Sequence, residues 1–141
     1  MYIEINDNTR IGDIETVFSN FYPYLQIGFY KRSHERYEMS DEKDLINPDV
    51  RVSDIKQTHI SGILEIRPLF TIAAVEKEFL QRFGLSVQIL WKEKNHWEQT
   101  TDMDDFTLKE LNEMGRSSSD AFILEDLDEG SEELPTPSDF H

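Results

Sequence analysis

The chain contains no cysteine among its 141 residues, which excludes disulfide bonds, thiolate nucleophiles and thiolate zinc sites together. Basic residues are scarce, since 14 Lys and Arg stand against 29 Asp and Glu, for a formal net charge of -15. Phosphate contacts need clustered Lys and Arg, so we expect no direct binding to nucleic acid or to anionic lipid. The sequence has neither an apolar run near the roughly 20 residues of a membrane helix nor a signal-peptide pattern at its start. These absences predict a cytoplasmic protein with no membrane partner.

Recognisable catalytic and metal-binding motifs are also missing. The six glycines are scattered singly and form no phosphate-binding loop or dinucleotide fingerprint. The four histidines, His34, His59, His96 and His141, are isolated in the sequence. A calcium loop starting at Asp102 fails because Phe106 and Thr107 stand where that loop needs an oxygen ligand and a glycine. We therefore expect a protein that is not an enzyme, with no catalytic residues, no cofactor and no metal.

Negative charge is concentrated at the C-terminal end. Residues 116–141 hold eight acidic residues against Arg116 alone, a net charge of -7, while residues 1–115 hold 21 acidic and 13 basic residues, a net charge of -8. A segment so polar buries too little apolar surface to offset its chain entropy. The sequence predicts one folded domain over residues 1–115 and a largely disordered acidic tail over residues 116–141, with the boundary at Gly115.

An internal repeat is the most informative feature of the predicted domain. The sequence from Ile3 aligns with the sequence from Leu64 at an offset of 61, which becomes 62 after the first helical segment. The units span about residues 2–57 and 60–113. Apolar positions match in both, including those of Leu25-Gln26-Ile27 and Val87-Gln88-Ile89. The chain therefore looks like one structural unit used twice.

Each unit has the pattern of a strand, a helix, a strand, a hairpin strand and a short helix. Apolar and polar residues alternate from Ile3 and from Leu64, as in half-buried strands. Apolar residues recur at helical spacing over 11–21 and 72–83, with Thr71 as a predicted N-cap and Gly84 just past the end. Thr107 and Glu110 have the spacing of a capping box.

These elements predict an α+β fold in a single domain. Two tandem units can place both main helices on one face of a mostly antiparallel sheet, in a ferredoxin-like arrangement. An alternative comes from residues 61–113, where TIAAVEKEFLQRFG leads into VQILWKEKNHWEQTTDMDDFTLKEL and resembles the ubiquitin-like β-grasp pattern. The segment from Phe83 to Gly115 also resembles a group of conserved bacterial proteins of no assigned function. That resemblance implies a single cytoplasmic domain and no chemistry.

Candidate binding residues are aromatic and apolar. Trp97 is expected on the exposed side of its hairpin, with Trp91 facing inward, and Trp is enriched among residues that dominate protein interfaces. Phe122, Ile123 and Leu124 form an apolar cluster within the acidic tail, and Phe140 stands near its end. Such a cluster is costly in water unless it docks, either on its own domain as a last strand or on a partner.

The leading hypothesis is a non-enzymatic protein-interaction module whose acidic tail engages a basic surface of another protein. Two alternatives stay open: an acidic decoy that inhibits a nucleic-acid-binding protein, and a regulatory domain that binds a small ligand. An unpaired sheet edge would also allow a homodimer.

Overall fold

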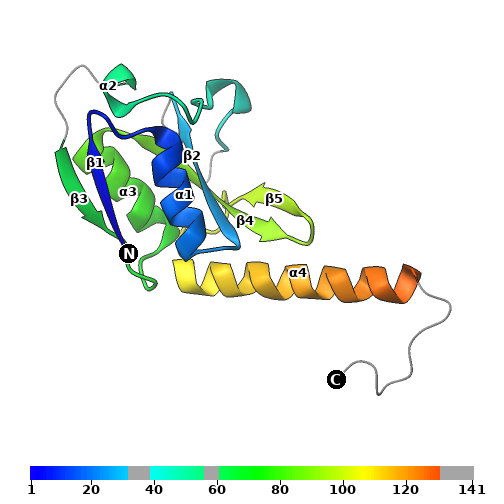
Figure 1. Ribbon diagram of the computed structural model, residues 1–141. Coiled ribbons are helices and arrows are strands. Elements are labelled where there is room, and N and C mark those ends of the chain that lie inside the picture. The colour runs from blue at the N-terminus through cyan, green and yellow to red at the C-terminus, as the bar shows by residue number, and fades with distance from the viewer. Residues whose placement is uncertain (32–38, 56–60, 131–141) are drawn as a thin grey trace.

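Helices and strands follow one another along most of the chain, in the order shown by the computed structural model (Figure 1). The structure describes residues 1–31, 39–55 and 61–130, the last six of these by their backbone alone. The elements are β1 (Tyr2–Asn6), α1 (Ile11–Phe21), β2 (Leu25–Tyr30), the short 3₁₀ helix η1 (Glu42–Asp44), α2 (Val52–Ile55), β3 (Ser61–Glu65), α3 (Ile72–Phe83), β4 (Ser86–Glu93), β5 (His96–Gln99) and α4 (Leu108–Gly130). The predicted α+β class is confirmed, and the small single domain is consistent with a ferredoxin-like α+β arrangement.

The strands form two antiparallel sheets and not one continuous sheet. β1 pairs with β3 in one sheet, and the other has the order β2-β4-β5. In the first sheet Ile3 lies opposite Leu64, and in the second Ile27 lies opposite Ile89. These are the residue pairs that the two sequence units align with each other. Because β3 pairs with β1 and with no other described strand, it does not link the two halves as the β-grasp alternative would require.

The helix ends have the caps that the sequence predicts. The Thr71 hydroxyl accepts a hydrogen bond from the backbone N–H of Ala74 at 3.1 Å, and Gly84 ends α3 with a positive φ of 65°. At the start of α4 the Thr107 hydroxyl accepts from the Glu110 N–H at 3.1 Å, and the Glu110 carboxylate accepts from the Thr107 N–H at 3.2 Å. Each cap satisfies backbone donors that would otherwise lack a partner within the helix.

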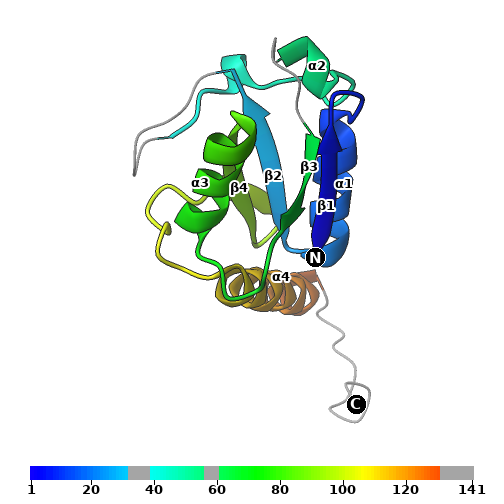
Figure 2. The ribbon, with the colours of Figure 1, turned by 90° about the vertical axis from the view of Figure 1, so that its left-hand side faces the viewer.

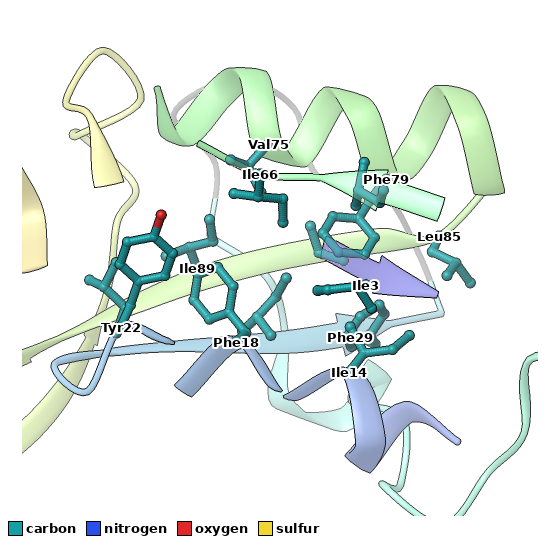
Figure 3. Packing of buried hydrophobic residues seen from close by; sticks show 14 of the residues in the cluster. Ile3, Ile14, Phe18, Tyr22, Phe29, Ile66, Val75, Phe79, Leu85 and Ile89 are labelled. Carbon is teal, nitrogen blue, oxygen red and sulfur yellow. The ribbon is translucent and has the colours of Figure 1, made fainter. Parts of the chain in front are cut away.

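The core lies between the two sheets and the two long helices of the repeat units. Viewed from the side of the β1–β3 pair, α1 lies behind β1, and β2 and β4 appear between β3 and α3 (Figure 2). Figure 3 shows Phe18 of α1, Phe29 of β2 and Phe79 of α3 converging in this space. The rings of Phe29 and Phe79 meet edge to face, with 5.6 Å between their centroids. Full burial of such a side chain stabilises the fold by about 1.5–3 kcal/mol.

Helix α4 differs most from the sequence-based expectation. It runs through the predicted domain boundary at Gly115 and continues to Gly130, so residues 116–130 are helical. Ala121 to Leu124 lie within this helix and do not form the last strand considered as one alternative. No described helix has the length and apolar character needed to cross a membrane. Residues 131–141 lie outside the described part of the chain.

Candidate binding surfaces

Hydrogen bonds from consecutive serines attach α4 to the body. The Ser118 hydroxyl accepts from the backbone N–H of Lys94 at 2.8 Å, and the Ser119 hydroxyl donates to the Lys94 carbonyl at 3.2 Å. Lys94 occupies the β4–β5 turn with a positive φ of 58°. Nearer the start of the helix, the Asn112 side-chain oxygen accepts from the Tyr24 N–H at 3.0 Å. The helix is thus fixed on the domain as far as residue 119.

Beyond these bonds α4 continues past the β4–β5 hairpin (Figure 1). On this part of the helix Ile123 and Leu124 are 56% and 57% exposed, while Phe122 is half-buried. Consecutive residues differ by about 100° around a helix, so these three side chains point in different directions. Phe122 lies on the same face of the helix as the buried residues Gly115 and Ser119, whereas Ile123 and Leu124 face solvent. Residues 114–130 of the helix are called the α4 arm below.

The arm is acidic. Arg116 is its one basic residue, and it forms ion pairs with Glu113 at 2.8 Å and Asp120 at 3.2 Å. No Lys or Arg follows Arg116 in the sequence, whereas eight acidic residues do. In the sequence, the exposed aliphatic residues Ile123 and Leu124 are therefore followed directly by unbalanced acidic residues.

The predicted residue Trp97 belongs to a second surface. It lies on β5, half-buried, and the ammonium group of Lys92 sits 5.2 Å from the centroid of its ring. Trp91, expected to face inward, is 9% exposed. Phe140 lies outside the described residues. Trp97 and the α4 arm are therefore on different elements of the fold.

A cavity of about 600 Å³ lies beside Trp97, on the face of the three-stranded sheet that points away from the core. Gln26, Leu90 and Gln99 are aligned across β2, β4 and β5 in register and form its floor. We call this cavity the sheet-face groove. Its lining residues are Glu15, Gln26, Ile27, Gly28, Tyr30, Met39, Glu42, Leu45, Leu90, Trp97, Glu98 and Gln99.

A hydrogen-bond network fixes one wall of the groove. The backbone of Ser40 exchanges two hydrogen bonds with the side-chain amide of Gln99, both at 2.9 Å. The Ser40 hydroxyl donates to the side-chain oxygen of Gln88 at 3.2 Å, and the Gln88 amide donates to Thr100 at 3.1 Å. Buried polar groups with partners on every side hold a single conformation. The segment from Met39 is thereby held against the sheet.

Burial shifts the acid–base properties of two groups in the groove. Desolvation raises the pKa of the Glu15 carboxyl from 4.5 to about 7. The pKa of Tyr30 is also raised, by desolvation first and then by the negative charges of Glu42 and Glu15. The two carboxylates therefore act on the phenol electrostatically, and the groove carries a negative field.

Three potential metal ligands meet at the hairpin. Glu93, His96 and Glu98 each offer one atom, and these atoms lie within 4.8 Å of one another. His96 and Glu98 are exposed, and the His96 Nε2 atom lies 2.9 Å from a Glu98 carboxylate oxygen. The contact between His96 and Glu98 is that of an ordinary ion pair on the surface of a hairpin. His34, His59 and His141 lie outside the described residues.

Other cavities adjoin the described residues. One of about 550 Å³ lies between the end of β2, α2 and the start of β4, and one of about 590 Å³ lies between the end of α1 and the start of α4. Another, of about 520 Å³, shares Glu15, Gln26 and Ile27 with the sheet-face groove. Tyr22 lines the cavity between α1 and α4, and its buried hydroxyl has no hydrogen-bond partner among the described residues. Figure 3 shows that hydroxyl at the margin of the core.

The sequence-based prediction missed Glu15, Tyr30 and Glu42 as site residues. A signal for Tyr30 was present, because the period of two along β2 puts Gln26, Gly28 and Tyr30 on the face opposite Ile27. Glu15 looked like an ordinary acid in the first helical turns, and only the fold brings it next to β2. Comparison of the chain with protein-family models, curated proteins and solved structures finds no match.

Proposed function

We propose that this protein is a non-enzymatic, cytoplasmic protein-interaction module whose α4 arm engages a basic surface of another protein. The observation that carries the proposal is the exposure of Ile123 and Leu124 on an acidic helix, beyond Ser119, which bonds to the Lys94 backbone of the domain. Helices of this kind bind partners by placing apolar side chains in a groove.

Charge and apolar contact have separate roles in this interaction. Negative charge from Asp120 onward attracts a basic partner over a distance and raises the association rate. Burial of Ile123 and Leu124 slows dissociation, because each would lose contact with water on binding. The domain formed by the two sequence units supplies the scaffold that holds α4.

The test begins with two altered proteins. A truncation after Asp120 keeps Ser118 and Ser119, which bind the Lys94 backbone, and removes the exposed apolar residues with most of the acidic ones. The double variant Ile123→Ser/Leu124→Ser removes the apolar contacts and leaves the charge unchanged. As a matched control, Leu69→Ser/Leu80→Ser replaces two leucines that are 74% and 44% exposed, one in the turn before α3 and one on α3.

Partners captured from cytosol by the full-length chain would be identified by mass spectrometry, and the affinity of the strongest would be measured at several salt concentrations. We expect about 10-fold weaker binding by the double serine variant with an unchanged salt dependence, since each buried aliphatic group contributes on the order of 1–2 kcal/mol. The truncation should lose both affinity and salt dependence. Equal affinity for the full-length chain and both altered proteins would refute the proposal.

A further inference from the structure

We propose that the sheet-face groove is a binding site for an organic cation, an ammonium or guanidinium group on an aliphatic chain. The groove lies on β2, β4 and β5, while the proposed partner surface lies on α4, so the two proposals stand or fall separately. Its volume of about 600 Å³ lies within the range of about 300–1,000 Å³ typical of small-ligand sites.

Charge is the first argument for a cation. Three carboxyl groups line the groove from three separate elements: Glu15 from α1, Glu42 from η1 and Glu98 from β5. None of the described lining residues is Lys or Arg. Glu15 has no hydrogen bond or ion pair with any described residue, although its carboxyl is partly buried. A partly buried carboxylate without a counter-charge is unfavourable, and a bound cation would remove that cost.

The Tyr30 hydroxyl is the second, independent argument. Tyr30 is 6% exposed, and its hydroxyl forms no hydrogen bond with the described part of the chain. It lies over Gly28, because a Cβ built on Gly28 would be 3.3 Å from the hydroxyl oxygen and 3.2 Å from the ring. Glycine thus keeps open the space into which the phenol points. Among the described residues only the Tyr22 hydroxyl is both fully buried and without a partner, so solvent reaches the Tyr30 hydroxyl from the groove, and a bound cation would donate a hydrogen bond to it in place of that solvent.

The apolar walls of the groove indicate that the part of the ligand next to the cationic group is aliphatic. Leu90 and Met39 line the groove together with the Trp97 ring, so an aliphatic chain would lose its contact with water there. The Lys92 ammonium already lies 5.2 Å from the centroid of the Trp97 ring, so this ring offers the ligand an apolar wall, and the cationic group is assigned to the carboxyl groups. A bare metal ion would leave these apolar walls without contacts, and an anion would be repelled by the three carboxyl groups.

Agmatine, a guanidinium group and an amine joined by four carbons, is a suitable probe. The sequence has two tryptophans, and Trp91 is 9% exposed, so a ligand-dependent change in tryptophan fluorescence would report Trp97. Titration at physiological salt would be repeated by calorimetry. We expect saturable binding of one agmatine per chain. No saturation in the millimolar range by either method, for agmatine and for the peptide described below, would overturn the proposal.

Variants locate the site. Glu15→Gln and Tyr30→Phe keep the size of each side chain and should weaken agmatine binding by about 10-fold and about 5-fold, as expected for loss of an ion pair and of a hydrogen bond from the cation to an uncharged oxygen. The control Glu4→Gln removes the same charge from an exposed position on β1 and should change the affinity by less than about 2-fold. If Tyr30→Phe does not fold, Glu15→Gln still decides the outcome. Equal weakening in Glu15→Gln and Glu4→Gln would indicate attraction by net charge alone and overturn the site.

A second ligand distinguishes the source of the cation. The capped tripeptide Gly-Arg-Gly presents the same guanidinium group on a peptide backbone. Tighter binding of agmatine identifies a free amine as the natural ligand class, while tighter binding of the tripeptide identifies an arginine side chain of a protein. Either result supports the cation site, provided that Glu15→Gln weakens the binding of the tighter ligand.

Discussion

Replacing Glu15 by Gln should make the protein more stable at neutral and alkaline pH and leave its stability almost unchanged near pH 4. The physical reason is the cost of keeping an ionised carboxyl group partly out of water. Burial raises the pKa of Glu15 from 4.5 to about 7. The folded state therefore holds this proton over a pH range in which the unfolded state has lost it.

The sign follows from proton linkage. Between pH 4.5 and about pH 7 the folded state binds more protons at Glu15 than the unfolded state does, so the stability due to this group falls as pH rises. Each pKa unit corresponds to about 1.36 kcal/mol, which gives about 3.4 kcal/mol for the whole interval. Because solvent reaches Glu15, screening reduces this figure, and we expect a gain of about 1–2 kcal/mol for Glu15→Gln above pH 7.

Urea denaturation at pH 4, 5.5, 7 and 8.5 would measure this gain, with Glu4→Gln as the control for a change in net charge. The difference between Glu15→Gln and the parent protein should grow from pH 4 to pH 7 and then stay constant. The control should show a smaller and less pH-dependent difference, because Glu4 is exposed. A constant difference at all four pH values would refute the assignment of this cost to ionisation of Glu15.

Two further substitutions test the packing of α4 and α1. Gly115→Ala should destabilise the protein by about 1–3 kcal/mol although alanine favours helix, because the new Cβ would lie 2.8 Å from the Tyr24 Cβ and 3.1 Å from its carbonyl oxygen. Urea denaturation would measure it, and greater stability in the variant would contradict the observed contact. Tyr22→Phe should leave stability unchanged or raise it by up to about 1 kcal/mol, since the buried hydroxyl it removes has no partner among the described residues. Its melting temperature would be compared with that of the parent, and a clear decrease would show that the hydroxyl has a bonding role.

Local patterns predicted most of the domain. The periodicity of 11–21 and 72–83, the cap at Thr71 and the capping box at Thr107 depend on neighbouring residues, and all are present in the structure. The end of α4 depended on long-range contacts. Ser118 and Ser119 are typical of linkers because their hydroxyls compete with helix formation, but here those hydroxyls bond to the Lys94 backbone, 24 and 25 residues away in the sequence. A local pattern cannot show such a partner.

The groove could not be predicted from the repeat because it depends on positions at which the two units differ. Their alignment matches Gly28 with Leu90 and Tyr30 with Lys92, and Gln26 with Gln88. Gln88 is buried in the network with Ser40 and Thr100, whereas Gln26 lines the groove. Similarity between the units revealed the strands, while the groove is formed where they differ: at a glycine that leaves space, and at a tyrosine that points into it. Replacing Gly28 by Leu, the residue at the matching position, should therefore fill the groove and abolish agmatine binding, while Gly62→Ala, which adds a side chain on β3 away from the groove, should leave agmatine binding unchanged.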